Sequence, residues 1–148
     1  LATSSAASDV YKRQDPSMPV DDDVRPRIGL GKNMSARDYL LLLRGQQQIK
    51  KSFLEALDGF DALITPTTAQ PALKLAEIDQ SGSAAGFTRP VNLIEHCALA
   101  LPNGFSSNGL PFSLQIVCAP YREALALRIG WAFQNATSWH HRYPRDFH

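Results

Sequence analysis

The fold of this chain is decided by one stretch, Thr88-Arg-Pro-Val-Asn-Leu-Ile-Glu-His-Cys-Ala-Leu-Ala-Leu-Pro-Asn-Gly-Phe105. Its early proline suits a first helical turn, so we expect a short helix over residues 91–96. The apolar residues 98–101 then predict a strand, and residues 112–117 predict a second one. Between the two strands, Ser107-Asn-Gly109 supplies the residues that tight turns prefer. The stretch therefore predicts a short helix that leads into a β-hairpin.

A long helix is predicted upstream of this stretch. Ser35-Ala-Arg-Asp38 has the form of a capping box, with an acidic residue three places after the cap. Gln46 interrupts the apolar stripe, and Gly59 provides a stop. About 23 residues at 1.5 Å per residue give a rod of roughly 34 Å, which needs a broad sheet to cover. The apolar positions recur at helical spacing: Leu42, Ile49, Phe53 and Leu57.

Two further elements complete the expected fold. Residues 62–65 are apolar and are stopped by Pro66, which predicts a short buried strand. Residues 122–136 have apolar positions on one side and predict a closing helix. A chain of 148 residues has room for one core. We therefore expect an α/β fold, in which a mixed β-sheet is covered by α-helices.

Composition and charge exclude several classes of partner. The hydrophobic content of 44% and the charged content of 20% are ordinary for a globular protein. The net charge of +1 comes from 15 basic and 14 acidic side chains, so we expect no nucleic-acid or membrane partner. Residues 1–14 have no long apolar centre and do not form a secretory signal, which favours a cytoplasmic protein. Cys97 and Cys118 are expected to be buried free thiols, and a disulfide between them stays open.

No local motif supplies catalytic chemistry. Residues 104–109 superficially match a nucleophile elbow, but they have one residue too many and join two strands. His96 and Cys97 are adjacent, so their side chains diverge and cannot easily share a proton. His140 and His141 have no further Cys or His at ligand spacing. We therefore predict no catalytic residue, no metal site and no cofactor in this chain.

Several short segments together resemble the amidase-signature hydrolases. They are Thr65-Pro-Thr67, Pro90-Val-Asn-Leu93, the turn from Leu101-Pro102 to Gly104, and Gly109-Leu-Pro111. The resemblance covers roughly residues 25–143. It implies that the parent protein hydrolyses carboxamides, or uses them as an ammonia source, through an acyl-enzyme formed on a Ser. A second Ser and a Lys pass protons in that family, and all three lie upstream in a Gly/Ser-rich segment that nothing here matches.

The resemblance also implies how the chain is organised. Residues 15–148 are expected to be the carboxyl-terminal portion of a single amidase domain, inactive alone, that acts in the full enzyme on a small-molecule amide. Residues 1–14 are small, polar and aperiodic, and we expect a disordered, non-native tail that resembles translated sequencing-adapter sequence. A homodimer stays open. The alternative is a non-catalytic α/β interaction module that binds a protein partner.

Three residues are candidates for the substrate side of the pocket. In the A subunits of glutamine-dependent tRNA amidotransferases, which this chain also resembles, an Arg before the long helix binds the substrate carboxylate, and Arg27 matches that run. Thr88 and Asn92 offer short polar groups where the chain enters the apolar hairpin, although such residues often only satisfy local backbone groups. Those subunits carry an acidic residue where this chain has Ala85. This difference favours a general amidase.

Overall fold

The computed structural model describes residue 17 and residues 29–79 and 84–143. The chain divides into two compact units, Leu1–Leu41 and Leu42–His148, and every described strand belongs to the second unit. The elements in chain order are α3 (Ala36–Ala56), β1 (Leu63–Pro66), the 3₁₀ turn η1 (Leu75–Glu77), α4 (Thr88–Leu93), β2 (Cys97–Phe105), β3 (Pro111–Cys118), α5 (Glu123–Ala136) and the 3₁₀ turn η2 (Trp139–His141).

The ends of α3 follow the predicted signals. Ser35 Oγ accepts a hydrogen bond from the Asp38 amide at 3.1 Å and donates one to the Asp38 carboxylate at 2.6 Å, which confirms the cap. After the helix, Gly59 adopts a φ of +79° that favours glycine. The apolar stripe is present but only partly covered by the described residues, because Phe53 packs on His96 whereas Leu42 is 58% exposed and Ile49 50% exposed.

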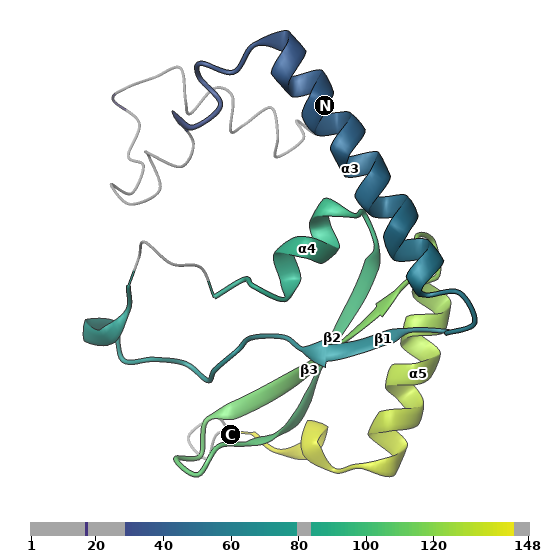
Figure 1. Cartoon of the computed structure of the whole chain (residues 1–148). Helices are drawn as coiled ribbons and strands as arrows, with labels where there is room; N and C mark the ends of the chain where they lie inside the picture. Colours follow the sequence, from purple (N-terminus) through teal and green to yellow (C-terminus); the bar gives the residue numbers. More distant parts are fainter. Residues whose placement is uncertain (1–16, 18–28, 80–83, 144–148) are drawn as a thin grey trace. The chain divides into compact units, whose positions relative to one another are not determined.

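The three described strands form one antiparallel sheet in the order β1-β3-β2 (Figure 1). β3 lies in the centre, where Leu63 pairs with Val117 and Cys97 pairs with Cys118. A bulge between Pro102 and Gly104 shifts the register near the hairpin end. The α/β class is as expected, and every strand pairing among the described residues is antiparallel.

The link between β2 and β3 is a tight hairpin turn. The Gly109 amide donates to Ser106 O at 2.9 Å, and the Leu110 amide donates to Ser106 Oγ at 3.0 Å. Gly109 has a φ of +78°, as the bulge position of such a turn requires. Residues 104–109 are therefore a hairpin connection, as the sequence predicts, and not a nucleophile elbow.

The core lies between the sheet and α5. It consists of buried apolar side chains from both layers: Leu101, Leu114, Ile116, Cys118, Leu125 and Ala126. Helix α5 contacts both β2 and β3. It approaches them closely at Gly130, where an added Cβ would lie 2.6 Å from Leu99 Cδ2. Only a residue without a side chain fits there unless Leu99 moves.

Helices α4 and α5 cover opposite faces of the sheet (Figure 1). Side chains alternate between faces along a strand, so Leu114, Ile116 and Cys118 point toward α5. Gln115 points the other way and bonds to the chain at the start of α4. Val91 of α4 and Ile94, which follows the helix, are both buried on that side. The sheet therefore positions α4, the element that carries two of the predicted site residues.

Candidate functional site at helix α4

Thr88 and Asn92 lie together on α4, whereas Arg27 lies outside the described residues. The helix begins at Thr88, three residues before the predicted start, with Pro90 in its first turn. Residues four apart lie on the same face of a helix, so Thr88 and Asn92 are neighbours along it. Thr88 is half-buried and Asn92 is exposed. The helix thus presents one polar face while Val91 faces inward.

The start of α4 is fixed to the sheet by Gln115. This side chain is only 4% exposed. Its Nε2 donates to Thr65 Oγ1 and to Phe87 O, each at 3.2 Å. One amide group on the central strand therefore joins β1, β3 and the residue that precedes α4. Buried hydrogen bonds of this kind fix an element because losing either partner leaves a polar group unsatisfied.

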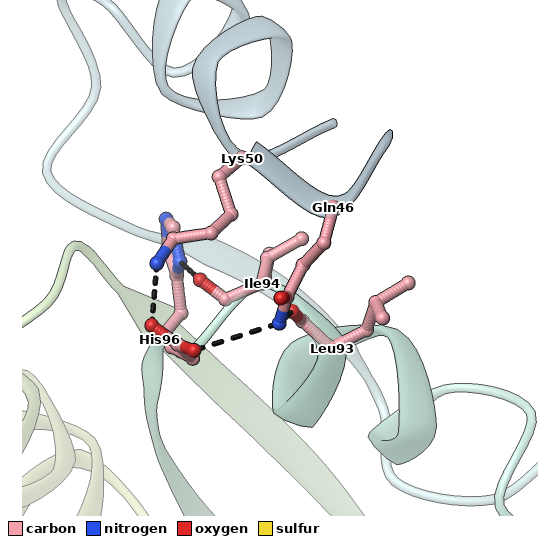
Figure 2. A network of polar contacts seen from close by, with 6 residues as sticks. Gln46, Lys50, Leu93, Ile94 and His96 are labelled. Atoms are coloured by element: carbon pink, nitrogen blue, oxygen red, sulfur yellow. Dashed lines mark hydrogen bonds and ion pairs between the residues drawn. The ribbon is translucent and has the colours of Figure 1, made fainter. Parts of the chain in front are cut away.

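The end of α4 is fixed to α3, as Figure 2 shows. Gln46 Nε2 donates to Leu93 O at 2.7 Å and lies 3.5 Å from Glu95 Oε1. Lys50 Nζ forms an ion pair with the other carboxylate oxygen of Glu95, and the Lys50 side chain is only 18% exposed. Gln46 is the polar residue that interrupts the apolar stripe of α3, and its side chain makes the contact that holds the end of α4.

Glu95 ends α4 in a conformation that is unusual for its type. The Glu95 amide donates to Asn92 O and the His96 amide donates to Val91 O, the pair of bonds that closes a helix around a left-handed residue. Glycine commonly occupies that position, but Glu95 adopts it with a φ of +56°. The carboxylate contacts with Gln46 and Lys50 offset part of the backbone strain.

His96 is held in place by packing and by one backbone contact. It is 8% exposed, and its ring meets that of Phe53 edge-on at 5.0 Å between centroids. Nδ1 lies 2.9 Å from Ile94 O, and a carbonyl only accepts, so Nδ1 carries the proton. Nε2 is buried and has no hydrogen-bond partner among the described residues. His96 therefore packs between α3 and β2, separate from the polar face of α4.

Three surface depressions lie near the sheet and its helices among the described residues, and the two larger ones are at α4 and at the hairpin end. One of about 560 Å³ borders α4 and is lined by Ala85, Gly86, Arg89, Pro90 and Leu93. A larger one, of about 690 Å³, lies at the hairpin end, where its polar lining includes Thr65, Asn103 and Ser113. The larger depression includes neither Thr88 nor Asn92. The smaller one borders the same helix, but its lining also includes neither Thr88 nor Asn92, and Arg89 is the one charged side chain in that lining.

The described residues contain no group of three or more His, Cys, Asp or Glu side chains that could hold a metal ion. The rings of His140 and His141 lie 3.8 Å apart between centroids and are tilted by 45° to each other. Across residues 29–79 and 84–143, no helix combines the length and the apolar character needed to cross a membrane.

Residues 3–127 match the protein family described as Amidase. The chain belongs to the amidase family. The match begins inside residues 1–14, and the non-native origin of that segment stays a prediction. The resemblance expected from the short sequence segments is confirmed, as is the α/β class of the family fold.

Curated relatives in this family are longer proteins. The glutamyl-tRNA(Gln) amidotransferase A subunit of Geobacter metallireducens is 36% identical over 128 residues, which cover 80% of this chain and 26% of the relative. Its counterpart in Thermodesulfovibrio yellowstonii is 39% identical over 131 residues, 82% of this chain and 27% of the relative. The chain thus spans about a quarter of the length of these relatives.

Solved structures of the family share the fold. A crystal structure of an amidase, 23% identical, superposes with a TM-score of 0.76 over 90% of this chain and 32% of its own. An allophanate hydrolase of Kluyveromyces lactis, 28% identical, superposes with a TM-score of 0.73 over 87% of this chain and 22% of its own. The hairpin, α4 and α5 described above are therefore one part of a larger family architecture.

Proposed function

We propose that this chain is the carboxyl-terminal portion of an amidase that hydrolyses a small carboxamide through a Ser acyl-enzyme. The nucleophilic Ser, the second Ser and the Lys belong to the remainder of that enzyme. One observation carries the proposal: the chain matches the family over residues 3–127, and its alignments with the relatives span about a quarter of their length. The chemistry needs nucleophile activation and oxyanion stabilisation, which Thr88 and Asn92 do not supply.

The contribution of this chain is the wall of the substrate pocket formed by α4. Thr88 and Asn92 present short polar groups on one face of a helix that is fixed at both ends by Gln115 and Gln46. A fixed helix holds such groups in one geometry, which lowers the entropic cost of binding a substrate. Arg27 is the proposed partner of a substrate carboxylate, since its guanidinium offers a planar fork of donors.

The test compares the isolated chain with a full-length amidase that contains it. The isolated chain should show no turnover of a simple amide such as acetamide, because the nucleophile and its base are elsewhere. In the full-length enzyme, Asn92→Ala should raise KM about tenfold with a smaller change in kcat, whereas Asn135→Ala on α5 should leave both unchanged. Turnover by the pure isolated chain, or equal effects of the two variants, contradicts the proposal.

A second candidate function is a non-catalytic module that binds a protein partner. The observation that favours it is the exposure of large apolar side chains on α5, where Leu127 is 60% exposed and Trp131 68% exposed. The relatives are named as one subunit of an amidotransferase, which supports a protein partner for this chain as well. If a full-length protein hydrolyses an amide and loses this activity in the Asn92→Ala variant, the amidase function is favoured over the binding module.

A further inference from the structure

Two cysteines that are distant in the sequence lie directly opposite each other in the sheet. Cys97 opens β2, Cys118 ends β3, and the antiparallel register pairs them. Both are free thiols. Opposed residues in an antiparallel pair have Cα atoms about 4.5–5.5 Å apart. Disulfide-bonded cysteines have Cα atoms about 4.4–6.8 Å apart, so the backbone pairing already meets the separation that a disulfide needs.

The two side chains also lie on the same face of the sheet. Opposed residues of paired strands share a face, and both cysteines pack in the core beneath α5. Cys97 Sγ lies 3.3 Å from Ala119 O, so this sulfur is directed toward the end of β3. Cys118 is fully buried, whereas Cys97 is half-buried. A reagent in solution therefore reaches the pair through Cys97.

We propose that Cys97 and Cys118 are a modification site that forms a reversible cross-strand disulfide with a small-molecule disulfide oxidant of the glutathione class. The Cys97 thiolate attacks one sulfur of the oxidant, expels the other half as a thiolate and forms a mixed disulfide. The Cys118 thiolate then attacks the Cys97 sulfur, forms the new bond and expels the second half. The two cysteines lose two electrons and two protons, and the oxidant becomes two thiols.

The surroundings set the order of these steps. Burial raises the pKa of the Cys118 thiol, and the neighbouring Cys97 raises it further. A thiol with a raised pKa is a poor nucleophile at neutral pH, so Cys97 reacts first. Cys118 then completes the bond because the mixed disulfide lies beside it, and adjacency compensates for a small thiolate fraction. The product links the junction of α4 and β2 to the junction of β3 and α5.

The experiment treats a full-length amidase that contains this chain with oxidised glutathione at neutral pH and measures the masses of its chymotryptic peptides. The expected product is a link between the peptides that carry Cys97 and Cys118, lighter by two hydrogens than the two peptides together. Chymotrypsin cleaves after Phe105 and Phe112, which separates the two cysteines, so the linked peptides should separate only after reduction. The oxidised full-length enzyme should also unfold at a higher temperature than the reduced enzyme, because the bond constrains the unfolded state.

The matched control is the double variant Cys97→Ser, Ala98→Cys. It keeps two thiols and nearly the same sequence separation, but position 98 pairs with Val117 on the opposite face of the sheet from Cys118, and Ala98 itself is exposed. It should give at least about tenfold less intramolecular disulfide and accumulate the glutathione adduct instead. Equal yields of the intramolecular disulfide from the original protein and the variant would show that the bond does not depend on the sheet. A stable glutathione adduct of the original protein, or a dimer linked between two molecules, would also overturn the proposal.

Discussion

A single non-glycine residue, Glu95, determines how α4 ends. Its left-handed backbone closes the helix, and its carboxylate meets Gln46 and Lys50 from α3. The two effects oppose each other. The left-handed conformation is unfavourable for a residue with a Cβ by about 1–2 kcal/mol, while an ion pair with one exposed partner contributes about 0–1 kcal/mol.

Two substitutions at position 95 separate the backbone effect from the side-chain effect. Glu95→Ala removes the carboxylate and keeps the strain, whereas Glu95→Gly removes both. Local opening should therefore be harder in the Gly variant by about 1 kcal/mol, or roughly fivefold in hydrogen exchange. The amide to monitor is that of His96, which donates to Val91 O and closes the helix. Faster exchange in the Gly variant than in the Ala variant would show that strain at Glu95 is not significant.

At the scale of elements, α4 is defined by contacts from elements that are distant in sequence. Its start depends on Gln115 of β3 and its end on Gln46 of α3. The two anchors act on different bonds, so their effects on the helix should be separable.

We expect Gln115→Met to accelerate exchange of the Arg89 amide, which bonds to Ala85 O at the start of α4. The substitution leaves Phe87 O and Thr65 Oγ1 without their donor, at a cost of about 1–3 kcal/mol. The matched change Gln46→Met should act on the other end, at the amides of Glu95 and His96, and by less because that site is exposed. Identical exchange profiles for the two variants would contradict independent anchoring.

Local signals predict most of the elements, and they fail where contacts are distant in sequence. The cap at Ser35 and the turn at Gly109 depend on neighbouring residues, so the sequence identifies both correctly. The predicted start of α4 is three residues late, because Pro90 marks a first turn without fixing the first residue. The roles of Gln46 and Gln115 could not be predicted, since each depends on which elements the fold brings together. Of these two roles, the sequence gives a signal only for Gln46, which appears as a polar break in the apolar stripe of α3.

At the scale of the whole molecule, large apolar side chains remain on the surface of the second unit. Leu42 and Ile49 lie exposed on α3, and Leu127 and Trp131 lie exposed on α5. Patches of this kind mark surfaces that other protein normally covers. The matched region is about a quarter of the length of the relatives, and we propose that the remainder of an amidase domain covers these faces.

The isolated chain should therefore self-associate or unfold without a sharp transition. Size-exclusion chromatography should give species larger than a monomer, and thermal unfolding should be broad, because uncovered apolar surface favours association over cooperative folding. Leu127→Glu with Trp131→Glu should reduce association, since the two side chains are four residues apart on one exposed face of α5. The control Arg128→Glu changes charge on the same helix without removing apolar surface, so it should leave association nearly unchanged. A monomer with a single cooperative transition, in the original chain at micromolar concentration, would mean that these faces need no covering protein and that the chain folds without the rest of an amidase.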